Sequence, residues 1–133
     1  MILSDNDIVV LAVGANINAE ANVSKAIQLL RHHISSMHYS NPTWTKPIGI
    51  ASDDFLNCVI TGVCDIEYPS LLQLTKEIEK ICGDSRKQRE KGAIAMDVDI
   101  LLHHGKKYHP KDWGRQYIID GIREISAYCD SLS

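Results

Sequence analysis

Residues 94–102, with the sequence IAMDVDILL, carry the clearest local signal in the chain. Their apolar and β-branched side chains are typical of a buried strand. Side chains at positions i and i+2 of a strand point to the same face, so Asp97 and Asp99 are expected to project together. The opposite face then takes the apolar side chains Met96, Val98 and Ile100. The segment therefore predicts a strand with one acidic face and one apolar face.

Two other segments are expected to form strands of the same sheet. Residues 8–13 form an apolar, β-branched run that ends at Gly14. Residues 55–63 are also rich in strand-forming side chains. Between these two segments, two prolines and a glycine in residues 41–49 are expected to break regular structure.

Apolar residues that recur at helical spacing predict three helices. The first contains residues 23–34, and Asn18 or Asn22 is expected to cap it. The second helix lies between Pro69, which suits a first helical turn, and Gly83, which suits a helix end. The third helix covers 117–128. The order strand, helix, two strands, helix, strand, helix indicates an α+β protein. We expect a ferredoxin-like α/β/α sandwich with a mainly antiparallel sheet.

The overall composition is that of an ordinary globular protein. The chain has 133 residues, so a single domain over 1–133 is expected. A net charge of −3 indicates neither nucleic acid nor a membrane as a partner, and the first residues lack a signal-peptide pattern. We expect a cytoplasmic protein that acts as a monomer. Irregular spacing favours reduced, apolar side chains over a metal site for the four cysteines, Cys58, Cys64, Cys82 and Cys129.

The acidic pair on the strand suggests a metal–nucleotide site. Two adjacent carboxylates repel each other unless a cation lies between them. Mg²⁺ takes one or two carboxylates in proteins and completes its shell with water and substrate phosphates. Asp97 and Asp99 are therefore candidate Mg²⁺ ligands. The alternative is an exposed strand face that carries two solvated charges, because D-x-D alone is a weak motif.

Cationic side chains lie on both sides of the acidic strand. Segment 84–92 is polar without apolar periodicity, so a mobile loop is expected there, and it carries Arg86, Lys87, Arg89 and Lys91. Cations on such a loop can close over phosphates, and His109 and Arg115 beyond the strand can donate to phosphate oxygens. The alternative is that these side chains are solvated. His103 and His104 are assigned to the surface in either case.

An aromatic ring and an amide also share i, i+2 spacing. Phe55 and Asn57 are expected on one face of their strand, where a ring can stack on a planar heterocycle and an amide can bind its edge. Tyr117, at the start of the last helix, can supply a second ring. The alternative is that both aromatic side chains belong to the core.

Taken in order, these elements resemble the 6-hydroxymethyl-7,8-dihydropterin pyrophosphokinase family of folate biosynthesis. The match runs from Val10 to about Ile125. Six motifs together are far more specific than any one of them. The matching segments are Ala12-Val13-Gly14-Ala15-Asn16, Thr45-Lys46-Pro47-Ile48-Gly49, Phe55-Leu56-Asn57, Ile78-Glu79 with Gly83, Met96-Asp97-Val98-Asp99-Ile100-Leu101, and His109 to Arg115 with Tyr117.

The resemblance implies a ferredoxin-like fold and a reaction between two small molecules, ATP and hydroxymethyl dihydropterin. It implies that Asp97 and Asp99 hold two Mg²⁺ ions on ATP. It implies pterin contacts from the rings of Phe55 and Tyr117, the amide of Asn57, and the backbone of Thr45, Pro47 and Ile48. The implied nucleotide contacts are Lys76, Glu79, Arg86, Lys87, His109 and Arg115, with Arg86 and Arg115 also assigned to catalysis.

The segment before the acidic strand departs from the family pattern. Where the family carries G-R-x-R, this chain has Gly83-Asp84-Ser85-Arg86, and where it carries G-P-R, this chain has Gly92-Ala93-Ile94. Lysine does not reproduce the two-pronged contact of an arginine. Two alternatives therefore stay open. One is a divergent member that binds pterin or nucleotide but turns over poorly or acts on another alcohol. The other is a ferredoxin-like interaction module without catalysis.

Overall fold

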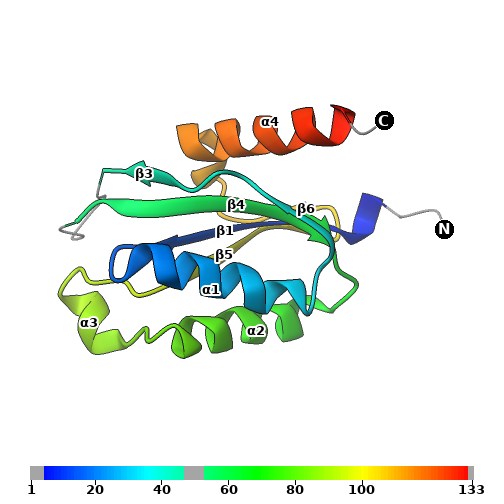
Figure 1. Ribbon diagram of the computed structural model, residues 1–133. Coiled ribbons are helices and arrows are strands. Elements are labelled where there is room, and N and C mark those ends of the chain that lie inside the picture. Colours follow the sequence, from blue (N-terminus) through cyan, green and yellow to red (C-terminus); the bar gives the residue numbers. More distant parts are fainter. Residues whose placement is uncertain (1–4, 47–52, 132–133) are drawn as a thin grey trace.

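A six-stranded sheet with helices on both faces forms the protein, for which the computed structural model describes residues 5–46 and 53–131 (Figure 1). The strands are β1 (Ile8–Ala15), β2 (Ser35–Tyr39), β3 (Thr43–Thr45), β4 (Phe55–Val63), β5 (Asp97–His103) and β6 (Lys106–Lys107). The helices are α1 (Ala19–Arg31), α2 (Tyr68–Ile81), α3 (Arg86–Glu90) and α4 (Gln116–Ser131). Short 3₁₀ turns cover Asp5–Asp7 and Asp112–Gly114.

The strand order confirms the predicted fold class. The order is β2-β4-β1-β5-β6, with β3 also paired to β4, and every pairing is antiparallel. The connection through α1 joins β1 to β2 with β4 between them, and the connection through α2 joins β4 to β5 with β1 between them. Two interleaved β-α-β units of this kind define the ferredoxin-like arrangement.

Alternation along the strands divides the core into two layers. Helices α1 and α2 lie on one face of the sheet and α4 lies on the other (Figure 1). The larger layer contains Val9, Leu11 and Val13 of β1 together with Met96, Val98 and Ile100. The layer beneath α4 contains Val10, Ala12, Val59, Leu101, Ile118 and Ile125. Because both faces are covered, β1 is buried along nearly its whole length.

The expected end signals hold for α2, whereas the expected asparagine cap of α1 does not form. Asn18 occupies the N-cap position with a left-handed φ of 45°, but its side chain makes no capping hydrogen bond. Asn22 does not cap either: its side-chain Nδ2 donates to the carbonyls of Ile17 and Ala95 and so ties α1 to the segment before β5. At α2, Pro69 lies in the first turn and Gly83 follows the helix with a φ of 94°.

Several sequence predictions of local structure are wrong. Helix α1 ends at Arg31, so Ile34 lies outside the helix that was expected over 23–34. Segment 84–92 contains the short helix α3, because the hydroxyl of Ser85 accepts a hydrogen bond from the Gln88 amide and starts a helical turn. Residues 41–49 include β3, which pairs with β4, and β2 comes just before them. Strand β5 begins at Asp97 rather than residue 94, because the backbone of Ile94 bonds to Asn16 instead.

The buried polar and sulfur groups complete the picture of the core. His103 is not on the surface: it is only 3% exposed, and its Nε2 lies 2.7 Å from the Ile66 carbonyl. Three of the cysteines, Cys58, Cys64 and Cys82, are buried, and Cys129 is partly exposed. Among residues 5–46 and 53–131, no helix has the length and apolar character needed to span a membrane.

The contact between α4 and β4 passes through Gly121. A Cβ at this position would lie 2.6 Å from Val59 Cγ2, whereas a Cβ on Gly114 would meet no atom within 4 Å. We expect Gly121→Ala to lower the free energy of unfolding by about 1–3 kcal/mol through overpacking, although alanine favours a helix over glycine by about 1 kcal/mol. Gly114→Ala is the matched control, with no loss expected. Urea unfolding measures both, and an unchanged Gly121→Ala variant would contradict the close packing.

Candidate active site

Strand register places the chemically active side chains in one row across the sheet. Asp97 of β5 pairs with Gly14 of β1, Gly14 pairs with Asn57 of β4, and Asn57 pairs with Thr43 of β3. Directly opposed residues of antiparallel strands point to the same face. With strands about 4.8 Å apart, the row carries an acid and an amide roughly 10 Å from each other, with a glycine between them.

This row opens onto a cavity of about 260 Å³ on the α4 side of the sheet. The side of the cavity is fixed by Ala12, which lines it and also packs in the core layer beneath α4. Both acids of β5, the ring and the amide of β4, and residues just before α4 contribute. The lining residues are Ala12, Val13, Gly14, Thr45, Lys46, Phe55, Asn57, Asp97, Asp99, Asp112, Arg115 and Tyr117.

The acids Asp97 and Asp99 face this cavity together, as the alternation predicts. Val98 between them is buried in the opposite core layer. The side chains of Asp97 and Asp99 are 39% and 32% exposed. Burial, then the neighbouring charge of Asp97, raises the pKa of Asp99 to about 7. Two acids that resist joint ionisation form an environment that a cation would relieve.

The donor set fits Mg²⁺ with substrate phosphates. In the described part of the chain, no group of three or more His, Cys, Asp and Glu side chains could hold a metal by itself. A pair of carboxylates with an open cavity beside it is the arrangement that Mg²⁺ uses when phosphates and waters complete its shell. His109 lies at the edge of this pair, with Nε2 3.9 Å from Asp99 Oδ1.

The amide of Asn57 is held from two sides. Its Nδ2 donates to Thr45 Oγ1 at 2.6 Å and to the Phe55 carbonyl at 3.3 Å. A Cβ at Gly14 would lie 2.9 Å from Asn57 Oδ1, so only glycine leaves the amide its present place. Burial raises the pKa of Tyr117 to about 12, so its phenol stays neutral near pH 7. The cavity thus has planar groups, Phe55, Asn57 and Tyr117, in addition to the acids.

Two cations line the cavity. Arg115 lies just before α4, and Lys46 lies just after β3. Arg115 Nε lies 2.9 Å from Asp112 Oδ1, within the turn that leads into α4. This ion pair orients the guanidinium at the cavity wall. Asp112 was not foreseen, and only its place three residues before Arg115 could have suggested the pair.

The remaining predicted contact residues in the described part of the chain do not line this cavity. Glu79 is buried on α2 and accepts a hydrogen bond from the Val98 amide at 2.8 Å, while Lys76 Nζ lies 3.5 Å from Glu79 Oε1. Burial is the main cause that raises the pKa of Glu79. On α3, Lys87 is exposed, and Arg86 is 95% exposed and pairs with Glu90 at 3.7 Å. Pro47 and Ile48 lie outside the described residues.

Sequence reasoning treated Arg89 as one of four similar loop cations, but the structure distinguishes it. Its Nε lies 2.6 Å from Asp84 Oδ2, and its Nη2 lies 3.3 Å from Asp97 Oδ1. No spacing in the sequence marks this residue, because the contacts depend on how α3 packs against the start of β5. Gly14 was likewise expected only as the end of a strand, whereas it makes room for Asn57.

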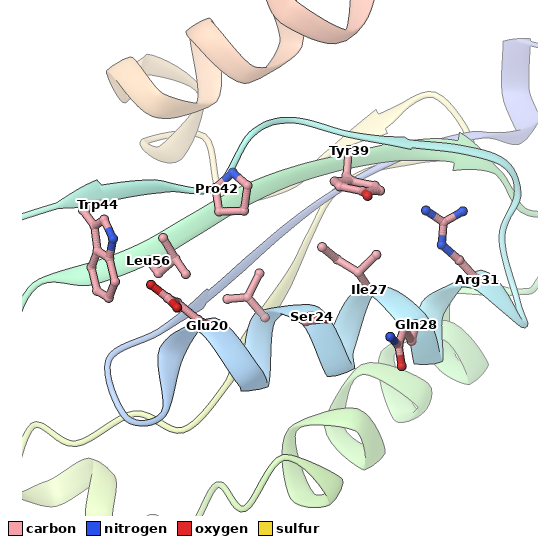
Figure 2. A pocket seen from close by; sticks show the side chains of 10 residues that line it. Glu20, Ser24, Ile27, Gln28, Arg31, Tyr39, Pro42, Trp44 and Leu56 are labelled. Carbon is pink, nitrogen blue, oxygen red and sulfur yellow. The ribbon is translucent and has the colours of Figure 1, made fainter.

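A second cavity lies on the other face of the sheet, between α1 and strands β2 to β4 (Figure 2). Its volume is about 500 Å³, and Trp44, Tyr39 and Leu56 face α1 across it (Figure 2). Trp44 and Leu56 alternate with the residues of β3 and β4 that line the first cavity. Among the described residues that line it, Glu20 is the only acid, so they contribute no carboxylate pair.

The comparison with protein families agrees with this site. The family model described as 7,8-dihydro-6-hydroxymethylpterin-pyrophosphokinase (HPPK) matches residues 10–127. A comparison with curated proteins gives no match. The matched range spans most of the chain and includes every residue that lines the 260 Å³ cavity. The chain therefore belongs to the 7,8-dihydro-6-hydroxymethylpterin-pyrophosphokinase family.

Proposed function

We propose that the protein transfers a pyrophosphoryl group from Mg²⁺-bound ATP to the hydroxymethyl group of 6-hydroxymethyl-7,8-dihydropterin and releases AMP, as a step of folate biosynthesis. One observation carries the proposal: a carboxylate pair and an aromatic–amide pair face one cavity. The first suits metal-bound phosphates, and the second suits a planar heterocycle with polar edges. Family membership supports the same substrates.

The part of the cavity lined by Phe55, Asn57 and Tyr117 would bind the pterin. The rings of Phe55 and Tyr117 would stack on its two faces, and Asn57 would bond to its edge. Backbone groups of Thr45, Pro47 and Ile48 would complete these contacts. The internal bonds of Asn57 to Thr45 and Phe55 support this role, because an amide already fixed in place loses little freedom on binding.

The acidic end would bind ATP. Asp97 and Asp99 would hold two Mg²⁺ ions, which when bound neutralise charge on the phosphates. Arg115 and His109 would donate to phosphate oxygens, and Arg86 would add a further phosphate contact and take part in catalysis with Arg115. Lys76, Glu79 and Lys87 would contact the nucleotide. For the contacts from α2 and α3, the bound ATP would have to extend beyond the cavity, since none of these side chains lines it.

The reaction would be an in-line displacement at the β-phosphorus of ATP. The pterin hydroxymethyl oxygen forms a bond to this phosphorus, and the bond from the phosphorus to the oxygen that bridges the α-phosphate breaks. AMP leaves with that oxygen, and the hydroxyl proton passes to solvent. Most of the catalysis would come from holding the alcohol and the triphosphate in line, as in other phosphoryl transfers.

A divergent member with slow turnover is the second candidate, and one observation favours it. Asp84 stands where the family pattern has an arginine, and it pairs with Arg89. Because Asp84 holds Arg89, the α3 segment offers the cavity fewer available cations than the sequence alone suggests. Measurement of AMP release from Mg–ATP, with and without hydroxymethyl dihydropterin, separates the candidates. Pterin-dependent AMP release with turnover of about 1 per second or faster supports the first candidate. Pterin binding with much slower AMP release, or with none, supports the second.

The carboxylate pair yields a prediction for activity. Asp97→Asn and Asp99→Asn should each lower kcat by at least about 100-fold, because each removes a charge that would hold metal-bound phosphates. The AMP-release assay measures this. Asp130→Asn, an exposed acid of α4, is the control and should retain full activity. Unchanged turnover in both cavity variants would remove the metal assignment.

The pterin end yields a prediction for affinity. Asn57→Ala should raise the Kd for the pterin by about 10-fold or more, as expected for a lost buried hydrogen bond, and leave the Kd for a Mg–ATP analogue nearly unchanged. Titration calorimetry measures both constants. Gln28→Ala, which changes the other cavity, should leave pterin binding as in the wild type. If Gln28→Ala raises the pterin Kd and Asn57→Ala does not, the pterin binds in the cavity beside α1, and the proposal is wrong.

The raised pKa of Asp99 yields a prediction for stability. The pKa of Asp99 is about 7 in the folded chain, whereas the ordinary value of an aspartic acid is 3.8. Its contribution to the stability of the fold is therefore fully present below pH 3.8 and is lost as the pH rises through about 7. Asp99→Asn cannot ionise. Without metal, this variant should be more stable than the wild type at pH 8, and the gap should shrink at pH 5. Urea unfolding at the two pH values measures this, and a gap of equal size at both would contradict it.

A further inference from the structure

Arg89 joins three segments at one end of the sheet. It belongs to α3, and its Nε bonds to Asp84 Oδ2 at 2.6 Å in the segment that follows α2. Its Nη2 donates to the Met96 carbonyl at 2.9 Å and to Asp97 Oδ1 at 3.3 Å, at the start of β5. The same Nη2 lies 3.8 Å from Glu79 Oε2 on α2. One guanidinium therefore faces three carboxylates, and one of them is the candidate metal ligand Asp97.

This cluster is a poor device for stability alone. Asp84 Oδ1 is buried and has no hydrogen-bond partner in the described part of the chain. An unsatisfied buried oxygen costs stability, and partly buried ion pairs repay little of the cost of desolvating their charges. Burial lowers the pKa of Arg89, but the Asp84 hydrogen bond and the charges of Asp97, Asp84 and Glu79 raise it overall, so the guanidinium stays charged. The cluster therefore fixes the orientation of the Arg89 guanidinium at some cost in the stability of the fold.

The contact with Asp97 is anchored independently of the carboxylate. Arg89 Nη2 is bonded to the backbone carbonyl of Met96, the residue directly before Asp97. The guanidinium is thus fixed relative to the strand itself, with Asp84 holding its other edge. One oxygen of Asp97 receives a donor in a fixed position, which restricts rotation of the carboxylate and leaves its second oxygen for another ligand.

We propose that Arg89 is a positioning residue, held by Asp84, that orients the Asp97 carboxylate toward the metal-bound phosphates. This inference rests on the proposed function, because it assigns Arg89 a role through Asp97. Arg89 does not line the 260 Å³ cavity, so we assign it no contact with substrate. Partners that orient a metal ligand from behind typically change metal affinity or activity by about 10–100-fold when they are altered.

The test keeps the positive charge at position 89 and removes the fixed geometry of the guanidinium. Arg89→Lys retains a cation near Asp97 but cannot bond to Asp84, Met96 and Asp97 at once. We expect the Kd for Mn²⁺ in the presence of a saturating non-hydrolysable ATP analogue, measured by electron paramagnetic resonance on the full chain, to rise by about 10-fold. The pterin Kd should stay as in the wild type, which a general loss of structure would not allow. Lys91→Met, an exposed cation of the same segment, is the control and should bind Mn²⁺ normally.

A second variant tests the same claim from the other partner. Asp84→Asn should weaken Mn²⁺ binding in the same direction, and Asp84→Asn with Arg89→Lys should bind no more weakly than Arg89→Lys alone, because Asp84 acts through Arg89. Wild-type Mn²⁺ affinity in Arg89→Lys, or additive losses in the double variant, would overturn the inference. Asp97→Asn separates this failure from that of the proposed function: wild-type Mn²⁺ affinity in Asp97→Asn would reject the metal site itself.

Discussion

The antiparallel register between β5, β1 and β4 is the constraint on which the site depends. It places Asp97, Gly14 and Asn57 opposite one another, so an acid from late in the chain faces the same space as an amide from its middle. A slip of one residue in either pairing would turn its side chains to the other face of the sheet. After a slip of β5 the acids would meet the apolar layer beneath α1 and α2, and the cavity would lose its carboxylate pair.

The apolar residues between the functional ones enforce this register. Val98 and Ile100 are buried in the layer of α1 and α2, and they cannot reach the α4 side without exposing that surface to water. On β4, Leu56 and Cys58 alternate in the same way around Asn57. The same strands therefore contribute the core on one face and the chemistry on the other. On the cavity side, burial and charge conflict at the acids, where burial and a neighbouring charge raise the pKa of Asp99.

The predictable parts of the fold and site were those that depend on local periodicity. Alternation along a strand was enough to pair Asp97 with Asp99 and Phe55 with Asn57, and the element order was enough for the fold class. The expected order included two strands between the first and second helices, but β2 and β3 were not located. Their pairing with β4 determines them more than their composition does. Arg89 and the buried His103 were missed because their partners are brought together only by tertiary packing. The roles of Arg86, Lys87, Lys76 and Glu79 remain proposals that come from the family resemblance.

The central claim is that one cavity joins a metal-binding end to a pterin-binding end on the α4 side of the sheet. A crystal structure with Mn²⁺, a non-hydrolysable ATP analogue and the pterin tests it most directly, because the anomalous signal of Mn²⁺ locates the metal. We expect Mn²⁺ on Asp97 and Asp99, with the pterin between the rings of Phe55 and Tyr117 in the same cavity. Metal bound away from these carboxylates, or a pterin seated against Trp44 on the other face, would contradict it.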